Sequence, residues 1–141
     1  MPRVIVATDG SPGANRAVDA AARLAKATRA DLVILTVGGN ISGTELRRLA
    51  GVQGDLSEKL ESEAKQVLER ARERARRHGV TAKLQSAWGD PTQAIMDAAR
   101  RQKADILVIG RRGHSRLAGL LLGSVSQKLT SLAPCKVMVV P

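Results

Sequence analysis

The chain has 141 residues, about the length of one ordinary domain. Hydrophobic residues make up 43% and charged residues 26%, which is typical of a folded protein and excludes a disordered one. There is one Trp and no Tyr or Phe, so the core must be aliphatic and a ligand base cannot stack on Phe or Tyr. The formal net charge of +10 raises the question of a nucleic-acid or membrane partner.

In the first half of the chain, strand-length apolar runs alternate with helical patterns. Residues 4–8 predict a strand, and Ser11 followed by Pro12 then marks the start of a helix. A second buried strand is predicted at 32–37, and a glycine-rich loop, with a short helical turn at most, at 38–54.

The same alternation continues to the end of the chain. A long helix is predicted at 56–77, with Gly79 in the position of its C-cap, and His78 is expected to interact with the helix dipole. The remaining predicted elements are a weaker strand at 81–88, a helix at 92–102, strands at 106–109 and 136–140, and a helix at 124–132.

This order of elements predicts an α/β fold: one doubly wound, five-stranded parallel sheet, Rossmann-like, with helices on both faces. Residues 1–141 contain no linker, repeat or low-complexity tract, so we expect a single domain.

Three features bear on the compartment. No apolar run reaches the length of a membrane span, and the apolar start at 4–7 is too short for a signal sequence. Cys135 is the one cysteine and cannot form an internal disulfide, which favours a reducing compartment. We therefore expect a cytoplasmic protein with no membrane partner.

The densest basic stretch, residues 70–77, lies on the long predicted helix. Glu69 is spaced to pair with Arg72, and Glu73 with Arg76 and Arg77. A solvated helical face is favoured over a nucleic-acid patch, and stacking aromatics for single strands are missing. Nucleic acid is therefore not expected as a partner.

The most informative motif lies between the predicted strand at 106–109 and the helix at 124–132. It has the form Gly110-x2-Gly113-x9-Gly123-Ser124. Glycines allow close approach of the backbone to a ligand and positive φ angles, and the first N–H groups of the helix favour an anion. The hydroxyls of Ser124 and Ser126 could add donors. The segment matches neither the Walker nor the dinucleotide pattern, and it predicts a site for the phosphates of a nucleotide.

At these residues the chain resembles the universal stress protein family, and specifically its ATP-binding branch. Besides the glycine motif, the similarity includes the first-strand segment 6–11 (VATDGS), the turn 89–91 (GDP) and the closing strand 135–140. Thr36 departs from the His found in many members, and the 38–54 connection lacks their usual aromatics.

The resemblance implies the sheet order 3-2-1-4-5, a bound ATP with Mg²⁺ held through its phosphates, and a homodimer. The nucleotide-binding residues that it implies are Ala7, Thr8, Asp9, Val37, Ile109, Gly110, Arg112, Gly113, Gly123, Ser124 and Val125. For Asp9, capping of the first helix or its loop and contact with ribose or metal both stay open. The apolar strand 136–140 would pair two copies, since an uncovered apolar edge strand promotes aggregation.

The predicted function is that of an ATP-binding regulatory protein of the stress response. No nucleophile, base or metal cluster is evident beside the loop, so at most slow ATP hydrolysis is expected and no catalytic residue is assigned. The alternatives are a binder of cyclic AMP or another adenine nucleotide, or a basic protein associated with nucleic acid.

Overall fold

The computed structural model describes residues 2–38, 54–111 and 123–141. Five strands and four helices are assigned in this part of the chain. In chain order they are β1 (Arg3–Ala7), α1 (Pro12–Thr28), β2 (Asp31–Val37), α3 (Gly54–Arg77), β3 (Lys83–Ala87), α4 (Pro91–Arg101), β4 (Ile106–Gly110), α5 (Ser124–Leu132) and β5 (Lys136–Val140). The short helical turn considered within 38–54 lies outside the described residues.

All the strands pair in parallel, in the order β3-β2-β1-β4-β5. This confirms the expected topology. The largest difference in bounds is at β3, which is shorter than the predicted 81–88. It pairs with β2 alone, from Lys83 opposite Val33 to Ala87 opposite Val37, so an edge position limits its length.

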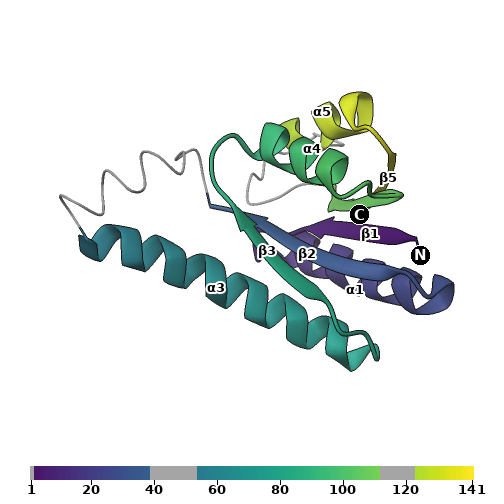
Figure 1. Cartoon of the computed structure of the whole chain (residues 1–141), viewed down its shortest axis with the longest axis horizontal. Helices are drawn as coiled ribbons and strands as arrows, with labels where there is room; N and C mark the ends of the chain where they lie inside the picture. Colours follow the sequence, from purple (N-terminus) through teal and green to yellow (C-terminus); the bar gives the residue numbers. More distant parts are fainter. Residues whose placement is uncertain (1, 39–53, 112–122) are drawn as a thin grey trace.

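The sheet lies between two layers of helices, α1 with α3 on one face and α4 with α5 on the other (Figure 1). Alternate residues of each central strand enter opposite cores, as the period of two requires. Val4 and Val6 of β1 pack under α1 and α3, whereas Ile5 packs under α4 and α5. No helix among the described residues is both long and apolar enough to cross a membrane.

The helix ends follow from local chemistry. The Ser11 hydroxyl caps α1 by accepting from the N–H of Ala14 at 3.2 Å, and the Asp90 carboxylate caps α4 by accepting from the N–H of Gln93 at 2.9 Å. Gly79, with φ +78°, follows α3 as expected of a glycine C-cap. Arg29 ends α1 in the same left-handed region, with φ 55°.

The first turn of α1 packs against the end of β4 with unusually little space. A Cβ at Gly110 would lie 3.1 Å from the carbonyl carbon and oxygen of Gly13 and 3.3 Å from the nitrogen of Ala14. These atoms belong to the backbone, which cannot rotate away as a side chain can. A side chain at position 110 would thus need the backbone of α1 to shift by a few tenths of an ångström, and the φ of Gly110 lies outside the left-handed region.

Asp19 of α1 joins the two helices on its face of the sheet. Its carboxylate accepts from Arg74 Nη2 at 2.7 Å and lies 3.2 Å from His78 Nε2. His78 thus interacts with a neighbouring helix, beyond the dipole contact that the sequence suggests. Burial raises the pKa of Asp19, but the hydrogen bonds and charges of Arg74 and His78 outweigh burial and hold the pKa below its ordinary value of 3.8.

Replacing Asp19 with Asn should lower the free energy of unfolding by about 2 kcal/mol at pH 7, because charged hydrogen bonds between two helices are lost. A lowered pKa in the folded state contributes stability above pH 3.8 that is lost as the pH falls further. The difference from wild type should therefore narrow as the pH falls below about 4. Urea unfolding across this pH range measures the difference in the free energy of unfolding.

The control Asp97→Asn removes an exposed pair with Arg100 and should cost less than about 0.5 kcal/mol. Equal losses in the two variants would contradict the stabilising role assigned to Asp19.

Gly110→Ala should lower the free energy of unfolding by about 1–2 kcal/mol, because the added methyl group forces apart the backbones of β4 and α1. Gly110→Val should cost more. Thermal unfolding of both variants tests this, and a Gly110→Ala protein as stable as wild type would show that the contact with Gly13 is not limiting.

Candidate functional site

A cavity of about 260 Å³ opens at the carboxyl ends of the central strands. The sheet order reverses between β1 and β4, which is where doubly wound sheets bind ligands. The lining residues come from the ends of β1, β2 and β4 and the starts of α1, α4 and α5: Ala7, Thr8, Asp9, Ala14, Leu35, Val37, Pro91, Ile95, Ile109, Gly110, Gly123, Ser124, Val125 and Ser126.

The structure brings nine of the eleven predicted binding residues to this one cavity. They are Ala7, Thr8, Asp9, Val37, Ile109, Gly110, Gly123, Ser124 and Val125. Arg112 and Gly113 lie outside the described residues.

Four further lining residues were not predicted: Ala14, Leu35, Pro91 and Ile95. For Pro91 and Ile95 a signal exists in the sequence, because α4 begins directly after β3 and must therefore start at the same edge as the glycine motif. For Leu35 there is none, since it reads as an ordinary core position of a buried strand.

At the end of β1 the polar side chains organise the turn into α1. The Asp9 carboxylate accepts from the N–H of Ser11 at 2.9 Å, and the Thr8 hydroxyl accepts from the N–H of Gly10 at 3.1 Å. Asp9 is exposed and lines the cavity, so its role in the turn is compatible with a position facing the cavity. Buried Thr36 donates its hydroxyl to the carbonyl of Thr8 at 2.8 Å, which ties β2 to this turn.

The start of α5 differs from the starts of α1 and α4. Its N-cap is Gly123, which has no side chain to accept from the first turn. The N–H of Gly123 donates to the Arg111 carbonyl at 2.8 Å. This N–H group is therefore not free to bind a ligand, which differs from the expectation drawn from the sequence. Ser124, Val125 and Ser126 form the first turn of α5, where backbone N–H groups have no acceptor within their own helix, and all three residues line the cavity. This end of the cavity is suited to an anion.

Two of the sequence-based expectations for this segment are wrong. The hydroxyl of Ser126 donates to the Gly110 carbonyl at 2.8 Å, so it is not available as a donor to a ligand. Gly110 has no positive φ, and its missing side chain makes room for α1. Both residues therefore act on the geometry of the site, because they hold the start of α5 against the end of β4.

The side of the cavity near β2 is fixed by an aromatic contact. The ring of Trp88 lies against the backbone of Gly38, at a place where any Cβ would collide with it. The N–H of Gly38 also donates to the Ala87 carbonyl at 2.9 Å, so the ends of β2 and β3 are held together directly beside Val37.

The described lining is mainly aliphatic, with polar groups at its two ends. No group of three or more His, Cys, Asp or Glu side chains among the described residues could hold a metal ion. Within that part of the chain, Asp9 is the one carboxylate of the cavity. The described lining residues can hold a ligand with an apolar body and an anionic end, and among them no side chains are grouped for nucleophilic or acid–base catalysis.

Known proteins match this chain over nearly its whole length. The model of the universal stress protein family matches residues 1–141. The universal stress protein YxiE of Bacillus subtilis is 35% identical over 98% of this chain and 97% of its own. A universal stress protein solved in complex with cAMP is 35% identical, with a TM-score of 0.78 over 99% of this chain and 97% of its own. The universal stress protein UspA from Lactobacillus plantarum shares the fold with a TM-score of 0.84 over 99% and 97% of the two chains, at 23% identity. The chain belongs to the universal stress protein family.

Proposed function

We propose that the chain binds an adenine nucleotide in the cavity at the carboxyl ends of β1, β2 and β4, with ATP as the ligand. The observation that carries the proposal is the start of α5. A helix whose first N–H groups lack a side-chain cap opens onto a largely aliphatic cavity at the point where the strand order reverses. A nucleotide combines the anion and the flat apolar body that such a site requires.

The base would lie against aliphatic side chains. Val37, Pro91 and Ile95 line the part of the cavity formed by β2 and α4. Because none of the described lining residues is aromatic, contacts with the faces of the base come from aliphatic groups, and hydrogen bonds to its edge would come from the backbone near Val37. Asp9 is placed for the ribose hydroxyls, since a carboxylate accepts from both.

The phosphates would lie at the start of α5. The N–H groups of Ser124, Val125 and Ser126 point out of the first helical turn, and the helix dipole favours negative charge there. The Ser124 hydroxyl adds a donor. Gly113 is assigned to the same end from the family motif, and Arg112 from its positive charge in the same segment of the sequence.

Mg²⁺ would be held by the phosphates, because the described cavity supplies Asp9 as its one carboxylate. Mg²⁺ prefers oxygen ligands and keeps several waters, so it does not require a protein cage. The same scarcity of acidic and nucleophilic groups is why we propose a regulatory binding module with at most slow hydrolysis of ATP.

Cyclic AMP is the second candidate. The relative solved with cAMP is 35% identical over almost the whole of both chains. A cyclic phosphate carries one negative charge and would make fewer contacts with the start of α5 than a triphosphate, so the two ligands should depend differently on that helix end.

We further propose that two copies pair along β5. This strand is at the edge of the sheet, its apolar residues Val137, Met138, Val139 and Val140 are half-buried, and Leu132 just before it is 61% exposed. Pairing would cover an edge that otherwise exposes an apolar strand. Analytical ultracentrifugation should show a dimer, and a monomer at high concentration would contradict it.

Ser124→Pro tests the phosphate site by removing one backbone N–H together with the Ser124 hydroxyl. Proline is favoured at the first position of a helix, and Gly123 before it already has φ −70° and ψ 165°, which suits a residue preceding proline. The variant should therefore fold and lose about tenfold or more in affinity for ATP, while its affinity for adenosine stays within about twofold. Isothermal titration calorimetry with ATP, cAMP and adenosine measures all three.

Ser124→Ala is the matched control, because it removes the hydroxyl and keeps the N–H. It should lose less ATP affinity than Ser124→Pro. Unchanged ATP binding by Ser124→Pro, or an equal loss for adenosine, would rule out the proposed placement of the phosphates. A wild-type preference for cAMP over ATP would identify the second candidate as the ligand.

A further inference from the structure

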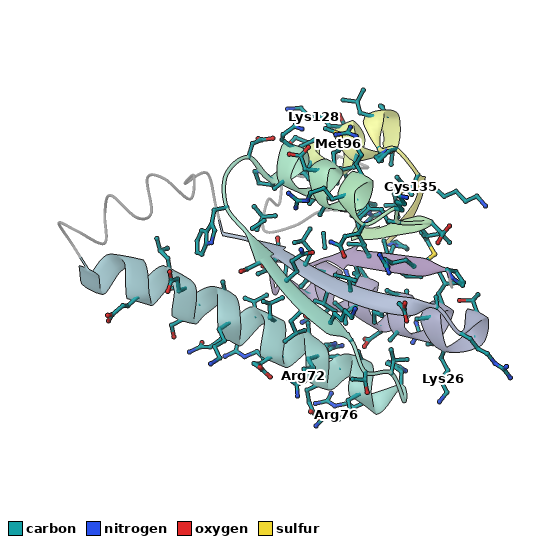
Figure 2. All side chains as sticks on the ribbon, viewed as in Figure 1. Lys26, Arg72, Arg76, Met96, Lys128 and Cys135 are labelled. Atoms are coloured by element: carbon teal, nitrogen blue, oxygen red, sulfur yellow. The ribbon has the colours of Figure 1, made fainter. Side chains whose placement is uncertain are left out.

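The edge of the sheet opposite the cavity is strongly basic. We define the amino edge as the side where the parallel strands begin and the helices end. Three helices end there with exposed cations: Lys26 and Arg29 at α1, Arg76 and Arg77 at α3, and Arg100 and Arg101 at α4. Figure 2 shows Lys26 and Arg76 pointing away from the body of the molecule at the ends of α1 and α3.

The strands and one turn add further cations to the same edge. Arg3, Lys83 and Lys136 are the first residues of β1, β3 and β5, and Lys103 follows α4. Several contacts confirm that these segments are neighbours. Arg3 Nη1 donates to the Gln102 carbonyl at 2.8 Å, so the start of β1 lies beside the end of α4. The ammonium group of Lys26 lies beside Gly79, so the ends of α1 and α3 adjoin.

The carboxylates near this edge do not balance the charge. Asp31 and Asp105 lie at the starts of β2 and β4, while Glu73 and Asp97 lie one turn inside the helix ends and face Arg76 and Arg100 at 3.8 and 3.4 Å. Ten cations against these four carboxylates leave six positive charges in excess.

Helix dipoles explain part of this pattern. Cations at helix C-termini are favourable, and each C-terminus is equivalent to about half a negative charge. Four helices thus offset about two charges, and about four remain. Dipole compensation alone therefore does not account for the number of cations at the amino edge.

We propose that the amino edge binds the phosphate backbone of a nucleic acid. The cations reach from β3 at one end of the sheet order to β5 at the other and include both helix layers, with Asp31 and Asp105 between them at the starts of β2 and β4. This spread suits a repeating polyanion better than a single phosphate. Interfaces with nucleic acid are polar and strongly positive, and contacts to phosphates need no base-reading element.

An acidic protein or an anionic membrane fits the amino edge less well than a nucleic acid. Protein interfaces have an apolar core, and stable membrane contact needs apolar side chains to insert. Among the described residues, Leu132 at the end of α5 is the one large hydrophobic side chain that is exposed. The basic stretch 70–77 overlaps the amino edge at Arg76 and Arg77. Arg72 and Arg76 face Glu69 and Glu73, as the sequence predicts.

The test compares two triple variants of equal net charge. The edge variant carries Arg29→Gln, Lys83→Gln and Arg101→Gln. The control variant carries Lys59→Gln, Lys65→Gln and Arg70→Gln, three exposed positions on α3 before its basic end. The probe is a fluorescein-labelled 30-base-pair duplex of mixed sequence, followed by anisotropy between about 50 and 300 mM salt.

The wild-type protein should bind the duplex at 150 mM salt. The edge variant should lose at least about tenfold in affinity, and the slope of log K against log salt should fall by about 2–3, since each phosphate contact contributes about 0.9. The control variant should lose less than about threefold. The charge-retaining variant Arg29→Lys, Lys83→Arg and Arg101→Lys should bind as wild type does, which separates lost charge from misfolding.

Three results would overturn the proposal. Equal losses in the edge and control variants would mean that affinity follows overall charge. Absence of wild-type binding at 150 mM salt would exclude the interaction. Tighter binding to phosphatidylserine vesicles or to polyglutamate than to the duplex would assign the edge to a membrane or an acidic protein instead.

Discussion

The contact between the end of β4 and the first turn of α1 is the constraint on which the rest of the site depends. Gly110 lets the two backbones approach to a distance at which a Cβ would already be crowded by Gly13. Two hydrogen bonds then connect the end of β4 to the start of α5. The Ser126 hydroxyl donates to the Gly110 carbonyl, and the N–H of Gly123 donates to the Arg111 carbonyl. The start of α5 is thereby held at the mouth of the cavity, where its N–H groups can meet an anion.

The fold separates two electrostatic regions at opposite edges of one sheet. Parallel strands require every helix to run back antiparallel to them, so the helix N-termini gather at the carboxyl edge and the C-termini at the amino edge. The first edge contains the cavity and the uncapped start of α5. The second contains the surplus of Lys and Arg. A net charge of +10 is thus compatible with a nucleotide site, because much of that charge lies on the far side of the molecule.

Rigidity around the cavity comes from contacts that do not touch a ligand. Thr36 bonds to the Thr8 carbonyl, and Trp88 packs on Gly38. Each links segments that are close in space and distant along the chain. A site made largely of backbone and aliphatic groups depends on such links, since it has few strong side-chain interactions of its own with which to orient a ligand.

The sequence by itself determined the order of the elements and the parallel sheet, because strand and helix periods and caps are local signals. The nine predicted residues that line the cavity followed from the resemblance to the universal stress protein family, with the glycine motif as its most specific part. The sequence also predicted the Glu69–Arg72 and Glu73–Arg76 pairs, which are one helical turn apart. Only the tertiary structure decided that Gly110 serves the packing of α1, that Ser126 bonds to Gly110, that Leu35 reaches the cavity and that His78 meets Asp19. It also gathered ten cations from separate segments at the amino edge. These features depend on distances between residues far apart in the chain, and no local pattern of residues encodes such distances.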